Sequence, residues 1–147
     1  MIKRILALVM AGTLLMTCPV FAGGLSRGEA EAQYKAAEAA IQGYKQALDT
    51  AISNVGSTRM EMDWAERKLD EAKKNAAGFV RPDDMDKKEA EGKKKNLKKE
   101  VEHAEEYYDY CKKLYNKALD AQNEAEHNLA DAFRDFDNAK TAFNNAQ

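Results

Sequence analysis

Apolar and alanine side chains recur at alternating gaps of three and four residues from Tyr34 to Phe79. The positions are Tyr34, Ala37, Ile41, Tyr44, Leu48, Ala51, Val55, Met62, Ala65, Leu69, Ala72, Ala76 and Phe79, and Thr58 fills the remaining slot. A mean spacing of 3.5 residues keeps one face of a helix apolar over many turns, which is the condition for a coiled coil. We therefore predict one long helix over residues 27–77.

The stretch "ISNVGSTRM" at residues 52–60 is the main challenge to that prediction, because glycine, serine and asparagine often end helices. Thr58 and Glu61 also have the spacing of a capping box that would start a new helix. A turn would normally add or drop residues, yet Val55 and Met62 lie seven apart, in step with the repeat. We expect the helix to continue through Gly56, and a kink without a change of direction stays open.

The chain reversal is predicted at residues 78–83, within "NAAGFVRPDDMD". Gly78 can take the left-handed conformation that ends a helix, Phe79 can fold back on the last turn, and Pro82 cannot continue the helix. Asp83 or Asp84 then caps a second helix over residues 84–146. Ser26 and Glu29 have capping-box spacing at the start of the first helix.

The second helix carries the same repeat, with small side chains in alternate slots and mostly large ones between them. The predicted seam is Leu97, Val101, Ala104, Tyr108, Cys111, Tyr115, Ala118, Gln122, Ala125, Leu129, Ala132, Phe136, Ala139, Phe143 and Ala146. Folding back at residue 83 places large residues opposite small ones, as at Tyr34 with Ala132, Ile41 with Ala125 and Met62 with Ala104, and it places Leu69 opposite Leu97. The predicted fold is all-α: an antiparallel hairpin of two long helices over residues 23–147, a two-stranded coiled coil that could pair into a four-helix bundle.

Some apolar residues of the second helix lie outside the cover that one hairpin provides. Tyr107, Leu114, Leu119 and Phe133 flank its seam. The last eleven or so residues, 137–147, are expected to overhang the first helix, so that Phe143 within them and Phe136 just before them need cover from elsewhere. These six residues are the candidate association face, for self-association or for a protein partner. The alternative is that long neighbouring side chains cover them.

Charge is also uneven along the predicted rod. Seven lysines lie near the turn: Lys87, Lys88, Lys93, Lys94, Lys95, Lys98 and Lys99. They are the candidate contact for an anionic partner, such as anionic lipid or the phosphates of lipopolysaccharide, whereas the opposite end of the rod is acidic. The alternative is a solvated helix stabilised by Glu–Lys pairs.

Residues 1–22 have the pattern of a cleaved secretory signal. Lys3 and Arg4 precede a short apolar run, and small residues at Val20 and Ala22 suit a signal peptidase. We expect cleavage near Ala22 and a periplasmic or secreted mature chain. Lipoprotein anchoring at Cys18 is the alternative, although Thr17 and Pro19 fit such a motif poorly.

Composition and motifs argue against several functional classes. Loss of Lys3 and Arg4 takes the basic count from 23 to 21 against 25 acidic residues, which disfavours nucleic-acid binding. Cys111 is then the only cysteine and occupies a seam position, and His103 and His127 fall on outward positions far apart. We expect no enzyme activity, no cofactor and no metal site.

Two classes of function remain. The first is an exported structural or adaptor coiled coil of the bacterial cell envelope that acts through protein–protein contacts. The alternative is a periplasmic holdase-type chaperone, or a protein that binds anionic surfaces through the basic tip of the hairpin.

Overall fold

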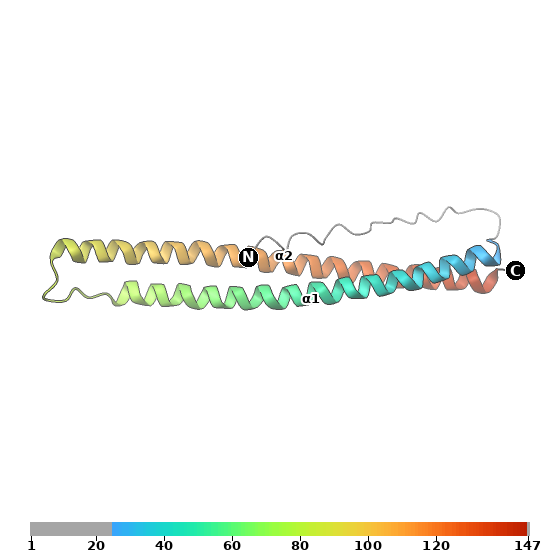
Figure 1. Ribbon diagram of the computed structural model, residues 1–147, viewed down its shortest axis with the longest axis horizontal. Coiled ribbons are helices and arrows are strands. Elements are labelled where there is room, and N and C mark those ends of the chain that lie inside the picture. Colours follow the sequence, from blue (N-terminus) through green and yellow to red (C-terminus); the bar gives the residue numbers. More distant parts are fainter. Residues whose placement is uncertain (1–24, 147) are drawn as a thin grey trace.

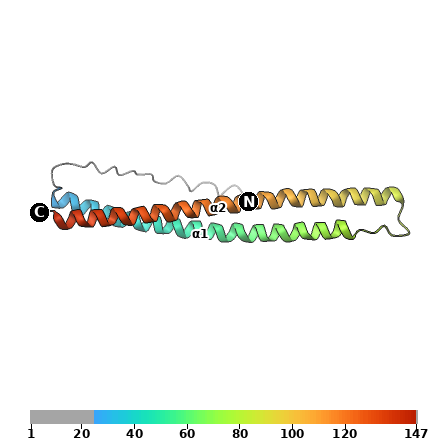
Figure 2. The same cartoon turned by 180° about the vertical axis from the view of Figure 1, so that it is seen from behind.

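The computed structural model describes residues 25–146 as two long helices, α1 (Arg27–Gly78) and α2 (Lys87–Asn145), joined by residues 79–86. They lie side by side and antiparallel, with the loop at one end of the rod and both the start of α1 and the end of α2 at the other (Figures 1 and 2). The 52 residues of α1 make a helix about 78 Å long at 1.5 Å per residue. The predicted all-α antiparallel hairpin is confirmed, while the predictions for the signal peptide, Ala22 and Cys18 lie outside the described residues.

Helix α1 runs without a break through residues 52–60. The Thr58 hydroxyl donates hydrogen bonds to the carbonyl oxygens of Asn54 (2.7 Å) and Val55 (3.2 Å), and the Ser57 hydroxyl donates to that of Ser53 (2.9 Å). The polar side chains therefore bond back to the preceding turn of the same helix instead of capping a new one. The continuous helix was the correct prediction.

The N-cap of α1 was predicted correctly, and the N-cap of α2 was not. The predicted capping box at Ser26 and Glu29 is present. The second helix starts later than predicted, because Asp86, and not Asp83 or Asp84, accepts a hydrogen bond from the Lys88 amide (3.3 Å). The Met85 amide donates to the Pro82 carbonyl oxygen (3.1 Å), so residues 83–85 stay in a turn.

The end of α1 also differs from the prediction. Gly78 remains helical, and the chain leaves the helix through Phe79 in an extended conformation with φ −69° and ψ 109°. The predicted left-handed glycine was wrong, because the extended Phe79 carries the chain away from the helix axis without one. Phe79 packs toward the start of α2, where the Lys93 ammonium lies 5.5 Å from its ring centre.

The predicted seam is the core of the rod. Every predicted seam residue of both helices is buried or partly buried. The most completely covered seam positions hold small side chains, with Ala65 and Cys111 each 1% exposed. Small residues let the two helix backbones come close, so the large residues of the facing helix cover them.

The register between the helices differs from the prediction. Tyr34 packs on Phe136 and Phe143, with ring centres 5.1 and 5.7 Å away, and not opposite Ala132. Lys73 pairs with Glu105 at 3.1 Å, again further along α2 than the predicted register allows. The predicted pairing was therefore wrong by about one heptad, because the connection is longer than expected and α2 starts later.

Because of this shift, α2 overhangs α1 at the loop end of the rod and not at its C-terminal end. Phe136 and Phe143 were expected to lack cover from the first helix, and this was wrong, since Tyr34 packs against both rings. The first turns of α2 instead extend past the end of α1, beside the loop (Figures 1 and 2). The loop end of the rod is thus built from one helix and an extended segment.

Candidate functional site

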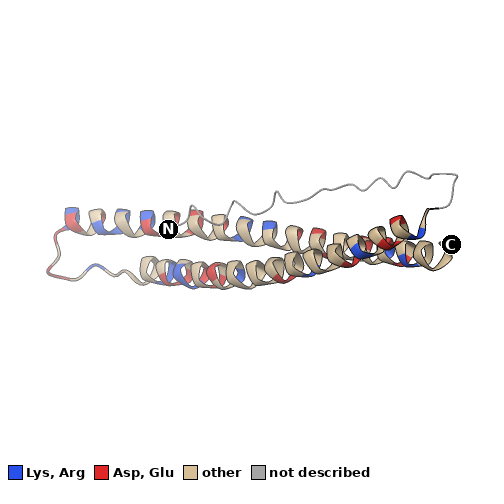
Figure 3. Cartoon of the chain, turned by 45° about the vertical axis from the view of Figure 1, so that its right-hand side comes forward, with Lys and Arg blue, Asp and Glu red and all other residues tan. Residues whose placement is uncertain are grey.

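The predicted lysine cluster lies on the first turns of α2, partly past the end of α1 and partly beside its last turns. Blue bands recur on the loop-end turns of α2, and the loop itself carries red at its turn (Figure 3). The apex is acidic because Asp83, Asp84 and Asp86 occupy the loop, so the basic region is the flank of the rod just behind it. All seven lysines are exposed.

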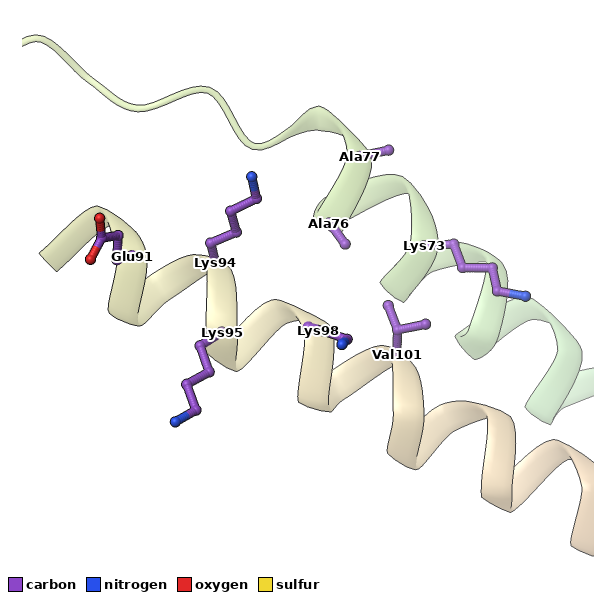
Figure 4. Close-up of a pocket in the computed structure, with 8 residues that line it drawn as sticks. All are labelled: Lys73, Ala76, Ala77, Glu91, Lys94, Lys95, Lys98 and Val101. Atoms are coloured by element: carbon purple, nitrogen blue, oxygen red, sulfur yellow. The ribbon is translucent and has the colours of Figure 1, made fainter. Parts of the chain in front are cut away.

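Four lysines surround a hollow of about 660 Å³ between the end of α1 and the first turns of α2, which we call the loop-end groove. Its floor is Ala76 and Val101, exposed Ala77 lies at its edge, and its rim is Lys73, Lys94, Lys95 and Lys98 with Glu91 (Figure 4). Ala76 and Val101 point into the gap between the helices, and Lys94 reaches toward the end of α1 (Figure 4). Lys95 extends away from α1.

A smaller hollow of about 280 Å³ adjoins the groove on the loop side. It shares Glu91 and Lys94 with the groove, and its other lining residues are Phe79, Arg81, Lys87 and buried Ala90. The structure therefore brings Lys87, Lys94, Lys95 and Lys98 to these two hollows. Lys88, Lys93 and Lys99 do not line either hollow.

The rim lysines differ in how far acidic neighbours neutralise them. Lys73 pairs with Glu105 at 3.1 Å and Lys98 with Glu102 at 3.8 Å, both at exposed positions. Lys94 and Lys95 form no ion pair among residues 25–146. Exposed pairs of this kind contribute little energy and break readily, so the rim keeps a positive potential.

The six residues of the candidate association face do not form one surface. Phe136 and Phe143 belong to the core of the rod, under Tyr34. Tyr107 donates a hydrogen bond to Glu61, whereas Phe133 lies under the Lys45 ammonium, 5.7 Å from its ring centre. Heptad geometry places Tyr107 and Leu114 on one flank of α2, and Leu119 and Phe133 on the other flank.

An exposed apolar surface lies on the Tyr107 flank, and of its residues only Tyr107 was predicted from the sequence. Met60, Trp64, Tyr107 and Tyr110 are 74, 48, 37 and 47% exposed, and we call them the aromatic patch. The Trp64 and Tyr107 rings meet edge to face with centres 6.0 Å apart. Trp64 has an outward heptad position, so only the contact across the two helices shows that it belongs with Tyr107.

Tyr107 joins this patch to the core. Its hydroxyl donates to Glu61 Oε1 at 2.9 Å, and this hydrogen bond, helped by partial burial, holds the pKa of Tyr107 well above its usual range. Burial raises the pKa of the neighbouring Cys111 thiol, against a smaller opposite effect of the Tyr107 hydroxyl. A buried, protonated thiol is a poor nucleophile, so Cys111 acts as a packing residue.

The two histidines lie far apart along α2. His103 and His127 are exposed, each next to one carboxylate of its own helix at 3.7 Å. In this range no three His, Cys, Asp or Glu side chains group as a metal site would require. Neither helix contains a stretch long and apolar enough to cross a membrane.

Comparison with known proteins adds no relative: no family model, no curated protein and no solved structure matches the chain. The aromatic patch and the loop-end groove are the two surfaces of the rod that bear on its function.

Proposed function

We propose that the protein is an exported structural or adaptor coiled coil of the bacterial cell envelope that acts through protein–protein contacts. The aromatic patch is the observation that carries this proposal. Trp and Tyr side chains are enriched at the centres of protein interfaces, because they bury a large area and keep a polar end for hydrogen bonding. A tryptophan that is 48% exposed in the middle of a rod marks a surface for a partner.

The rod itself supports a spacer or scaffold role. Tyr107 and Val101 are six residues apart and Trp64 and Ala76 are twelve apart, so about two to three helical turns separate the aromatic patch from the loop-end groove, and the seam holds that separation fixed. A second copy of the chain is one partner that the patch could take, and this would give the four-helix bundle. Another envelope protein is the other partner, and then the protein is an adaptor.

Site-specific crosslinking in the native envelope tests the patch. A photoreactive benzoylphenylalanine at Tyr110 should crosslink to a discrete protein, or to a second copy, with a yield at least severalfold above that at Lys113. Lys113 is the matched control, because it is exposed and only three residues away on the same helix. Trp64 is the only tryptophan, so its emission should shift to shorter wavelength when the purified partner is added. Equal products at Tyr110 and Lys113 would contradict a specific patch.

The holdase alternative makes a different prediction for the same patch. A holdase would suppress aggregation of a denatured outer-membrane protein, and replacement of Trp64 and Tyr110 by serine would weaken that suppression. An adaptor would show a discrete crosslinked partner and no suppression. The two outcomes separate client binding from assembly.

A second candidate function is binding of an anionic surface through the loop end of the rod. It is supported by the cationic rim of the loop-end groove, where Lys94 and Lys95 form no ion pair within residues 25–146. Basic clusters of this size attract anionic membranes by roughly 1 kcal/mol per lysine near the surface. The aromatic patch and the groove lie on different parts of the rod, so the two functions are compatible.

A further inference from the structure

We propose that the loop-end groove binds one anionic phospholipid of a membrane surface. The phosphate lies against Lys94 and Lys98, and an acyl segment lies on the floor. This inference rests on the second candidate function and adds to it a defined site, with a polar end and an apolar end. The two ends can be tested separately.

The groove exists because the coiled-coil seam runs out at this end of the rod. The last seam position within α1 is Ala76, and the next, Phe79, has already left the helix. Val101 of α2 therefore faces small residues, and Lys94, Lys95 and Lys98 lie beside the last turn of α1, where no large seam residue fills the gap. The resulting hollow of about 660 Å³ falls within the usual size of small-molecule sites, roughly 300–1,000 Å³.

The chemistry of the lining favours an amphiphile. The rim carries four lysines, of which Lys73 and Lys98 have carboxylate partners, while Lys94 and Lys95 form no ion pair within residues 25–146 and favour an anion despite Glu91 beside them. The floor and its edge offer only alkyl groups, at Ala76 and Val101 in the floor and at Ala77 on the edge (Figure 4). A peptide on this floor would leave backbone N–H and C=O groups without hydrogen-bond partners. Inorganic phosphate would leave the apolar floor exposed to water. An acyl chain would cover the floor with apolar surface and needs no hydrogen bonds.

The position of the groove also decides how the rod would meet a membrane. End-on contact would bring Asp83, Asp84 and Asp86 of the loop against an anionic surface. Contact through the flank brings the lysine rim to the surface and keeps these carboxylates beside it. The rod is therefore expected to lie with the loop-end flank on the bilayer.

Vesicle cosedimentation tests the polar end. The mature chain, residues 23–147, should bind vesicles that contain phosphatidylglycerol at low salt and should not bind pure phosphatidylcholine vesicles. Replacing Lys94, Lys95 and Lys98 by glutamine should weaken binding about a hundredfold. Replacing Lys112, Lys113 and Lys117 makes the same charge change roughly 25 Å further along α2, beyond the screening length, and should have little effect. Circular dichroism should show unchanged helicity in both variants, because lysine and glutamine have similar helix propensity.

A pair of substitutions at exposed Ala77 tests the apolar end. Ala77→Leu should bind short-chain phosphatidylglycerol at least about fivefold more tightly than Ala77→Gln, since the side chains are similar in size and differ in polarity. Isothermal titration calorimetry with dihexanoylphosphatidylglycerol should show saturable binding by the wild type. Glycerol 3-phosphate, which carries the phosphate without acyl chains, should bind far more weakly.

These experiments test the phospholipid site separately from binding of an anionic surface in general. No binding of wild type to phosphatidylglycerol vesicles, or equal losses in the two lysine variants, would overturn the second candidate function and the inference together. Groove-specific loss combined with equal affinities of the two Ala77 variants, or with glycerol 3-phosphate binding as tight as the lipid, would overturn only the phospholipid site. The groove would then be a simple anion site on a basic surface.

Discussion

Single polar side chains on this rod are accommodated by partners close in the chain or directly across the seam. Thr58 occupies a seam position, yet its hydroxyl bonds to carbonyl oxygens of its own helix and leaves no unsatisfied group in the core. Tyr107 reaches across the seam to Glu61. Hydrogen bonding back to the preceding turn is a property of threonine in helices, whereas the Tyr107 bond exists only because two helices meet.

The Tyr107–Glu61 hydrogen bond should make the free energy of unfolding depend on pH. Because the bond raises the pKa of Tyr107 in the folded state, it stabilises the fold below about pH 10, the pKa of an unfolded tyrosine. This contribution is lost as pH rises through the higher folded pKa. Tyr107→Phe should therefore lower the free energy of unfolding by about 0.5 kcal/mol at neutral pH, a value reduced for solvent screening, and the difference from wild type should shrink above about pH 10.

Urea unfolding at several pH values measures this effect, and Tyr110→Phe is the control. Tyr110 is exposed and makes no side-chain hydrogen bond within residues 25–146, so its replacement should leave the free energy of unfolding unchanged. A constant difference between wild type and Tyr107→Phe up to the highest pH tested would argue against the raised pKa.

At the scale of the element, continuity of α1 outweighs unfavourable local residues. Gly56 costs about 1 kcal/mol relative to alanine in a helix. Ending the helix there would expose up to four backbone N–H and four C=O groups and would remove Val55 and Met62 from a shared seam. The loss of packing and hydrogen bonding is larger than the cost of one glycine, so the helix continues.

Gly56→Ala should consequently stabilise the protein by about 0.5–1 kcal/mol in urea unfolding. An added Cβ at Gly56 would meet nothing within 4 Å, and the backbone there is helical. Gly43→Ala is a matched comparison in the same helix, also with open space, and should give a similar gain. A gain at Gly43 with a loss at Gly56 would indicate that residues 52–60 form a turn in solution.

At the scale of the whole molecule, the relative placement of the two helices determines which surfaces remain free. The observed register covers Phe136 and Phe143 and frees the first turns of α2. It therefore removes part of the original reason to expect self-association. It also creates the loop-end groove. If α1 and α2 ended at the same level beside the loop, the last turns of α1 would fill this space.

Truncation of Phe143 tests this register. Phe143→Ala should lower the free energy of unfolding by about 1–2 kcal/mol, less than for a fully buried phenylalanine, because its ring is partly buried against Tyr34. Phe133→Ala, at a position 44% exposed, should cost clearly less. If Phe143 overhung α1 as the sequence analysis expected, both substitutions would have similarly small effects in urea unfolding.

The sequence by itself determined the helices, their seam and their antiparallel course. The heptad spacing identified the seam positions of both arms, and Pro82 marked the reversal. Such periodic information survives in one sequence because each helix repeats it many times. The position of the second N-cap was missed by a few residues, because several aspartates in one loop can each serve as a cap.

Only the tertiary structure decided the register and the surfaces that depend on it. A heptad pattern is unchanged by a shift of seven residues, so large residues still face small ones when the pairing slips by one repeat. The length and path of the loop, with the exit of the chain through Phe79, selected one register among these equivalents. The aromatic patch joins side chains from both helices, and the loop-end groove exists where the shorter helix stops, so neither could be located before the two helices were placed against each other.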